Sequence, residues 1–259
     1  MPPDSINLEI VTVRCLADNY AFVLHNSATG QTALVDAPEA GPVQAELDAR
    51  GWTLSDIILT HHHWDHIDGL EPLRNDGVRV IGAAADAHRL PALDLAVNDG
   101  DRFDLCGEKT QVFDVSGHTI NHIAVFVPGA KAVFTADSLM ALGCGRLFEG
   151  TPAQMWRSLQ KLRELPDDTM VYSGHEYTEN NAKFALSIEP YNPDIISRVR
   201  ATIAARAKGE ATVPSRLADE KRTNPYLRAD DPVLMSALGM LNDSPTEVFA
   251  EVRNRKDNF

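Results

Sequence analysis

The sequence contains few cysteines, an excess of acidic over basic residues, and no long apolar stretch. The three cysteines among 259 residues, Cys15, Cys106 and Cys144, are too few and too widely spaced for a disulfide framework. We therefore expect reduced thiols in a reducing compartment. No apolar run approaches the ~20 residues needed to cross a bilayer. The first residues, MPPDSINLEIV, lack the basic and apolar regions of a secretory signal. These absences predict a cytoplasmic protein.

The charge balance excludes two classes of partner. Acidic residues outnumber basic ones by 37 to 24, which gives a formal net charge of −13 at pH 7. A general nucleic-acid-binding protein needs cations to displace counterions from phosphates, and docking on an anionic membrane surface needs basic clusters. We expect neither nucleic acid nor membrane as a partner. The composition, with 44% hydrophobic and 24% charged residues, is typical of a soluble globular protein, and nothing in it demands more than a monomer.

The sequence has two regions of different character. Up to residue 175, short runs rich in Val, Ile and Phe alternate with helical patterns, which predicts an α/β domain. After residue 175 the patterns are helical, which predicts a smaller C-terminal domain over residues 176–259. The expected strands span 8–13, 20–24, 32–35, 56–59, 78–81, 111–115, 122–127, 132–135 and 169–172. The expected helices span 42–50, 152 to about 166, 176–188, 193–208, 233–241 and 245–256.

Four histidines and an aspartate, in THHHWDH at residues 60–66, directly follow the apolar run at 57–59. Neutral imidazole and carboxylate are ligands for zinc, iron and manganese. In an extended chain alternate side chains share a face, so His61 and His63 can bind one ion while His62 points away. Asp65 and His66 follow too closely to join that pair easily, and they are better placed for a second ion nearby.

Three further candidate ligands stand where predicted strands end. His118 lies in SGHT, Asp137 ends FTAD, and His175 lies in SGH. Strand ends on one edge of a sheet are where such folds build sites. A single residue of this kind is more often a polar cap on a strand. Three of them alongside the histidine cluster favour a site for two metal ions.

These motifs resemble the metallo-β-lactamase superfamily. Within it, GCGRLFEG at 143–150 and VRNRKDNF at 252–259 resemble glyoxalase II, the hydroxyacylglutathione hydrolases. The resemblance covers essentially the whole chain and implies an αβ/βα sandwich, a helical C-terminal domain that contributes to glutathione binding, and two divalent ions. We expect zinc, with iron or manganese as alternatives. By motif position, the first ion would be held by His61, His63 and His118 and the second by Asp65, His66 and His175, with Asp137 bridging both.

The resemblance implies hydrolysis of S-(2-hydroxyacyl)glutathione thioesters. The chief substrate would be S-(R)-lactoylglutathione, cleaved to D-lactate and glutathione in methylglyoxal degradation. Two ions sharing a water would ionise it near neutral pH, and this bridging hydroxide, held by Asp137 and Asp65, would attack the thioester carbonyl. The residues implied in glutathione binding are Arg146, Arg253 and Lys256 as cationic anchors, Tyr177 through its hydroxyl, and Phe148 through its ring or backbone.

Alternatives on the same scaffold are a persulfide dioxygenase, which shares the HxHxDH pattern, or another hydrolase of this fold. A non-catalytic metal-binding module is a third reading. The sequence also departs from the family pattern at Asp68, Ser116, Asn121 and Ala136, none of which removes a ligand. His122 is similar to a family histidine that lies behind the ligands, and a plain core histidine is an equal alternative for it.

Overall fold

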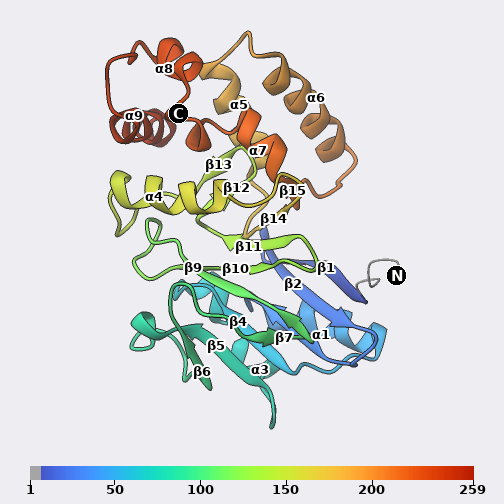
Figure 1. Ribbon diagram of the computed structural model, residues 1–259. Coiled ribbons are helices and arrows are strands. Elements are labelled where there is room, and N and C mark those ends of the chain that lie inside the picture. The colour runs from blue at the N-terminus through green and yellow to red at the C-terminus, as the bar shows by residue number, and fades with distance from the viewer. Residues whose placement is uncertain (1–6) are drawn as a thin grey trace, which may run out of the picture. The chain divides into compact units, whose positions relative to one another are not determined.

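The computed structural model describes residues 7–259 (Figure 1). The predicted absence of a secretory signal and the start of the predicted first domain fall partly on residues 1–6, outside the described residues. The chain divides into two compact units. Unit 1 comprises the described residues up to Asp114 together with Asn121–Phe134, and unit 2 comprises Val115–Ile120 and Thr135–Phe259. Along residues 7–259, every helix is too short or too polar to cross a membrane.

A six-stranded sheet is the centre of unit 1. Its order is β1-β2-β3-β4-β5-β6. The first three strands pair antiparallel, and the pairs from β3 to β6 are parallel. Parallel strands are covered on both faces, and every residue of β3 and β4 is buried. The strands are β1 (Leu8–Cys15), β2 (Asn19–Asn26), β3 (Thr32–Val35), β4 (Asp56–Leu59), β5 (Arg79–Ala83) and β6 (Leu95–Val97).

The rest of unit 1 consists of short helices and antiparallel strands. Branched side chains of the sheet, among them Val23, Leu34, Ile57 and Val80, pack into one apolar core. The helices are α1 (Ala40–Arg50), α2 (Trp64–Ile67), α3 (Leu70–Leu73) and the 3₁₀ turn η1 (Ala84–Asp86). The strand β7 (Asp104–Leu105) pairs with β8 (Glu108–Lys109), and β10 (Ile123–Val127) pairs with both β9 (Gln111–Asp114) and β11 (Ala132–Ala136), antiparallel in each case. The strand β11 continues past Phe134 into unit 2.

Unit 2 is mostly helical, and its last helices are orange to red in Figure 1. The predicted helix starts at Thr151 and Ser244 are confirmed, because each forms a capping box with the residue three positions on. The helices are α4 (Pro152–Arg163), α5 (Thr178–Ile188), α6 (Pro193–Ala207), α7 (Leu217–Thr223), η2 (Pro225–Leu227), α8 (Pro232–Leu238) and α9 (Pro245–Asp257). The strands are β12 (Leu139–Met140), β13 (Gly143–Cys144), β14 (Met170–Ser173) and β15 (Ser215–Arg216).

Some predicted boundaries are wrong for identifiable reasons. The helix predicted over 233–241 ends at Leu238, because Gly239 takes the left-handed conformation with φ 76° and terminates it. The helix predicted from 176 begins at Thr178. The strands over 32–35 and 56–59 are confirmed residue for residue. Two-residue strands such as β12 and β13 carry too short a pattern to be predicted from sequence.

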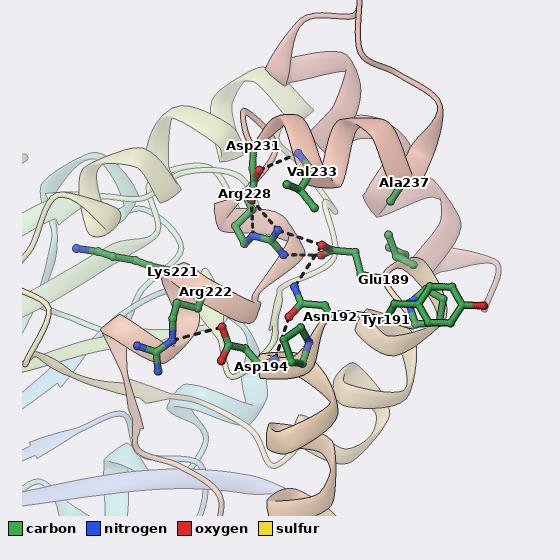
Figure 2. A pocket seen from close by; sticks show the side chains of 13 residues that line it. Glu189, Tyr191, Asn192, Asp194, Lys221, Arg222, Arg228, Asp231, Val233 and Ala237 are labelled. Atoms are coloured by element: carbon green, nitrogen blue, oxygen red, sulfur yellow. Dashed lines mark hydrogen bonds and ion pairs between the residues drawn. The ribbon is translucent and has the colours of Figure 1, made fainter.

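A buried arginine links the end of α5 to the start of α8 in unit 2. Nη2 of Arg228 lies 3.0 Å from Oε1 of Glu189, and its Nε lies 2.9 Å from Oδ2 of Asp231 (Figure 2). Asp231 also accepts a hydrogen bond from the backbone N–H of Val233 at 2.9 Å, which caps α8. A buried guanidinium is tolerated only when it is paired in this way, so these contacts fix α8. The same residues line a cavity of about 620 Å³.

The three cysteines are free and buried. Burial raises the pKa of the thiol to about 11 for Cys15 and to about 12 for Cys106 and Cys144. This agrees with the expectation of reduced thiols that take no part in a disulfide framework.

Candidate metal centre

The carboxyl ends of β3 and β4 bring a buried aspartate beside the histidine cluster. Val35 of β3 pairs with Ile58 of β4 in parallel register, so the residues that follow each strand emerge side by side. Asp36 follows β3 in a left-handed conformation with φ 57°. Its Oδ1 accepts the N–H of Thr60 at 2.9 Å, and its Oδ2 accepts the Thr60 hydroxyl at 2.9 Å. The start of the histidine cluster is therefore fixed to the sheet.

The same aspartate sets the protonation of two predicted ligands. Oδ2 of Asp36 lies 2.8 Å from Nδ1 of His66, and a carboxylate can only accept, so Nδ1 of His66 carries the proton. The Thr60 hydroxyl donates to Asp36, so its oxygen accepts from Nδ1 of His61 at 3.0 Å. Each neutral ring thus keeps the lone pair of Nε2 for a metal ion.

The four ligands predicted from the THHHWDH segment lie together in unit 1. The His61 ring centroid is 4.8 Å from that of His63 and 4.3 Å from that of His66. The one-turn helix α2 places Asp65 next to His66, with Oδ2 of Asp65 3.9 Å from Nε2 of His66. Asn19 holds Asp65 by donating to its backbone oxygen at 2.9 Å and to Oδ2 at 3.2 Å.

The remaining histidines of unit 1 have other surroundings. Nδ1 of His62 lies 3.1 Å from Oδ2 of the buried Asp86, in agreement with its exclusion from the predicted ligands. The ring of His122 is fully buried and stacks on that of His61, with centroids 4.5 Å apart. His122 therefore supports a ligand ring. His25 is half-buried and stacks on Trp52, whereas His88 is exposed.

Unit 2 contributes three predicted ligands, and two of them, both histidines, lie next to the carboxylate of the third. Oδ2 of Asp137 lies 3.4 Å from Nε2 of His118 and 3.3 Å from Nε2 of His175. Nδ1 of His118 lies 2.8 Å from the backbone oxygen of Arg146, an obligate acceptor, so Nδ1 carries a proton. In the neutral ring the Nε2 lone pair then faces the carboxylate, and a metal ion, or a proton on Nε2, makes this arrangement favourable.

Close backbone packing holds these ligands in place. A Cβ atom at Gly145 would lie 2.0 Å from the backbone oxygen of Asp137 and 2.9 Å from Nδ1 of His118. A Cβ atom at Gly117, next to His118, would lie 2.6 Å from the Met155 sulfur. Only glycine fits at these two positions, which accounts for Gly117 in SGHT and Gly145 in GCGR.

The donor chemistry of both units fits divalent metal ions. Hydrogen bonds at Nδ1 leave Nε2 of His61, His66 and His118, in their neutral rings, available to a metal ion. The residues that could hold a metal ion are His61, His63, Asp65, His66, His118, Asp137 and His175. This set of neutral nitrogen and carboxylate oxygen suits zinc, iron or manganese, and two ions are the number that such a set supports.

The predicted glutathione contacts all belong to unit 2, where they differ in exposure. The Arg146 side chain is 61% exposed, with its Nε 3.5 Å from Oδ1 of Asp257. Lys256 donates to the backbone oxygen of Asn180 at 3.1 Å and lies against the ring of Phe184. Partial burial lowers the pKa of its ammonium to about 8. Arg253 is only 7% exposed.

The buried Arg253 is bound to the protein itself. Its Nη1 donates to the backbone oxygen of Cys144 at 3.1 Å, its Nη2 lies 2.8 Å from Oδ1 of Asp257, and its guanidinium stacks over Tyr226. Its predicted contact with substrate stays a prediction.

Two exposed aromatic rings border the ligands of unit 2. Tyr177 is 40% exposed, and its ring stacks on His175 with centroids 4.7 Å apart and planes at 7°. Phe148 is 62% exposed and meets His118 edge-on at 5.3 Å. Both rings limit the movement of a predicted ligand while offering an open face to a bound molecule.

Sequence reasoning missed the residues that orient the ligands. Asp36 and Asn19 lie outside the quoted motifs, and neither is a predicted ligand. Asp36 had a usable signal, since it directly follows the strand 32–35 as Asp137 directly follows the strand 132–136. Asn19 had none, because a single asparagine at the start of a strand is ordinary in a turn.

Comparison with known proteins agrees with this arrangement. Residues 17–175 match the family model of the metallo-beta-lactamase superfamily, and residues 176–259 match that of the hydroxyacylglutathione hydrolase C-terminus. Among solved structures, the crystal structure of ETHE1 from Myxococcus xanthus is similar, with a TM-score of 0.65 and 25% identity, over 97% of this chain and 100% of that one. The fold is therefore the α/β metallo-β-lactamase sandwich followed by a helical C-terminal part.

Two relatives match over almost their full lengths. The hydroxyacylglutathione hydrolase of Ruegeria pomeroyi is 64% identical over 253 residues, which are 97% of this chain and 99% of that protein. The hydroxyacylglutathione hydrolase of a Jannaschia species is 60% identical over 252 residues, which are 97% and 98% of the two proteins. This chain therefore belongs to the hydroxyacylglutathione hydrolase family, metal-dependent hydrolases built on the metallo-β-lactamase fold.

Proposed function

We propose that this chain hydrolyses S-(2-hydroxyacyl)glutathione thioesters, chiefly S-(R)-lactoylglutathione to D-lactate and glutathione. The observation that carries the proposal is the match to proteins named hydroxyacylglutathione hydrolase over 97% of the chain, at up to 64% identity. The match to the C-terminal family model over residues 176–259 favours this activity over a persulfide dioxygenase or another hydrolase of the same fold. A non-catalytic module is disfavoured by the same relatives.

We propose that residues 1–175 form a catalytic, metal-binding domain and that residues 176–259 form a helical domain that contributes to glutathione binding. The first ion would be held by His61, His63 and His118, the second by Asp65, His66 and His175, and Asp137 would bridge them. We propose zinc in both positions, with iron or manganese as alternatives.

When bound, two such ions lower the pKa of a shared water and polarise a thioester carbonyl. The chain supplies the orientation. Asp65, held by Asn19, would accept a hydrogen bond from the attacking water and aim it. Asp36 keeps the His61 and His66 rings in the tautomer that leaves Nε2 without a proton. The leaving thiolate comes from a thiol of pKa ~8.5, so it departs without a general acid.

The substrate carries carboxylates, which the cations of unit 2 would bind. Arg146 is exposed and offers two parallel N–H donors to a carboxylate. Lys256 adds a positive charge. Arg253 would attract the substrate carboxylates by its charge, while its Nη1 remains hydrogen-bonded to the backbone oxygen of Cys144. Tyr177 would donate its hydroxyl, and Phe148 would offer its ring. The protein would work as a monomer in the cytoplasm.

The test is hydrolysis of S-(R)-lactoylglutathione by the purified zinc-loaded protein, followed by loss of the thioester absorbance. Turnover should disappear on chelation and return with metal. Asp137→Asn, which weakens the proposed bridging ligand, should lower kcat by more than ~100-fold. A fully metallated protein that turns over no glutathione thioester would contradict the proposal.

A further inference from the structure

The segment between Asp137 and Arg146 forms a tight hairpin of β12 and β13. Leu139 pairs with Cys144 and Met140 with Gly143. Leu142, at the turn, has φ 57°, the left-handed conformation that non-glycine residues rarely adopt. A two-residue ladder with a strained turn is not stable alone, so other groups must hold it.

Two buried side chains from the helical part of unit 2 bind this hairpin directly. Oε2 of Glu220, in α7, accepts the N–H of Leu142 at 2.9 Å. Nδ2 of Asn224, just after α7, donates to the backbone oxygens of Met140 at 3.0 Å and Gly143 at 2.9 Å. Asn224 also donates to Glu220 at 3.1 Å, so the two side chains act as one unit.

This pair is itself fixed in place. Glu220 and Asn224 are both 0% exposed. Arg198 of α6 donates to Glu220 and, at 2.7 Å, to the hydroxyl of Thr223. The backbone N–H of Tyr226 donates to Oδ1 of Asn224 at 3.0 Å. The polar atoms of the pair are thus satisfied, and such a network is rigid.

The hairpin leads straight into the environment of two metal ligands. After Cys144, Gly145 passes so close to Asp137 and His118 that a Cβ atom would not fit. The next backbone oxygen, that of Arg146, accepts from Nδ1 of His118 at 2.8 Å. Displacing the hairpin would therefore move the acceptor that sets the tautomer of His118.

We propose that Asn224 and Glu220 are positioning residues for the metal ligand His118, acting through the hairpin and the backbone oxygen of Arg146. The inference rests on the proposed function, because it takes His118 as a ligand of the catalytic metal. It gives the helical C-terminal part a second task besides glutathione binding, which is to hold the loop that follows the bridging aspartate.

Asn224→Ala tests the proposal because it removes both hydrogen bonds to the hairpin. In the zinc-loaded variant we expect a ~10–100-fold loss of zinc affinity, measured by chelator competition, and a similar loss of kcat with KM for S-(R)-lactoylglutathione within about twofold. The Nδ1–H proton of His118, observed by NMR, should exchange with solvent at least tenfold faster. Glu220→Gln should shift the same quantities in the same direction.

The matched control is Glu189→Gln. It weakens another buried ion pair of unit 2, that of Glu189 with Arg228, in which Arg228 also binds Asp231 and Glu189 also binds Asn192. Zinc affinity and exchange of the His118 proton should stay at the values of the unchanged chain. If Asn224→Ala and Glu189→Gln affect zinc affinity and proton exchange equally, the role of Asn224 is only structural and the proposal is overturned.

A measurement on the unchanged chain covers the case in which Asn224→Ala does not fold. Hydrogen exchange of residues 139–146 is compared before and after zinc removal. Protection of this hairpin should persist without zinc, because side chains hold it. If protection collapses there while α6 and α7 stay protected, the metal holds the hairpin and the proposal fails. Loss of zinc affinity in Asn224→Ala without thioester turnover in the unchanged chain would refute the proposed function alone.

Discussion

Replacing Asp36 with asparagine should weaken metal binding without touching a ligand. The carboxylate of Asp36 accepts from the N–H of Thr60 at 2.9 Å, from the Thr60 hydroxyl at 2.9 Å and from Nδ1 of His66 at 2.8 Å. In Asp36→Asn one oxygen becomes an amide nitrogen. If the remaining oxygen still accepts the N–H of Thr60, the new amide NH₂ faces the Nδ1–H of His66, and both groups are donors.

The size of the effect follows from that conflict. Either the His66 hydrogen bond is lost or the proton moves from Nδ1 to Nε2, the atom that would bind metal. A hydrogen bond to a charged acceptor is worth ~1.5–3 kcal/mol, which corresponds to a ~10–150-fold weaker metal affinity. Changes to residues that orient metal ligands produce losses of about this size.

The assay is competition for zinc between the protein and a chelator of known affinity, with thermal unfolding of the metal-free protein recorded alongside. Asp86→Asn is the matched control. Asp86 is equally buried and lies 3.1 Å from Nδ1 of His62, which is not a predicted ligand. Its zinc affinity should stay within about twofold of the unchanged chain. Equal zinc affinities for Asp36→Asn and Asp86→Asn would refute the tautomer argument.

Three further predictions concern charge, packing and backbone conformation. Lys256 loses its charge as pH rises through about 8, so KM for the anionic thioester should rise about two- to fivefold between pH 7 and 9. The variant Lys256→Arg stays charged and should flatten that rise. If the dependence of KM on pH is the same in the variant and the unchanged chain, Lys256 takes no part in binding. Gly145→Ala places a methyl group 2.0 Å from a backbone oxygen, so the purified protein should retain less than about a tenth of its zinc by elemental analysis; full zinc content would show that the loop yields. Gly51, which ends α1 at φ 68°, and Gly41, within α1, both have open space around them. In urea unfolding, Gly51→Ala should lower the free energy of unfolding by ~1 kcal/mol, whereas Gly41→Ala should raise it by ~0.5–1 kcal/mol. Changes of equal sign would contradict the backbone argument.

The main elements of the fold were predictable because they carry a long enough pattern. The strands 32–35 and 56–59 each contain three consecutive apolar residues that follow a polar one, and the capped helices begin where Pro152 and Pro245 follow a cap residue. The hairpin of β12 and β13 was not predictable, since two residues show no period and its stability comes from Glu220 and Asn224, far along the chain.

The sequence predicts candidate ligands for the site, but it does not predict the groups that orient them. Metal ligands are restricted to a few residue types, so a histidine cluster and residues at strand ends such as His118 stand out. The partners that fix their protons are ordinary groups, an aspartate for His66 and a backbone oxygen for His118. Two positions at which the sequence departs from the family pattern, Asn121 and Ala136, have φ of 68° and 40°, a region of backbone conformation that glycine adopts most easily.

The burial of the three thiols has a chemical consequence for a protein that would release glutathione. Only the thiolate takes part in disulfide exchange or adds to an electrophilic aldehyde. With a thiol pKa of about 11 at Cys15 and about 12 at Cys106 and Cys144, at most about one thiol in ten thousand is ionised at pH 7. None of the three side chains is open to solvent. The cysteines of the protein should therefore resist mixed-disulfide formation with glutathione, its proposed product, and should resist adduct formation with aldehydes.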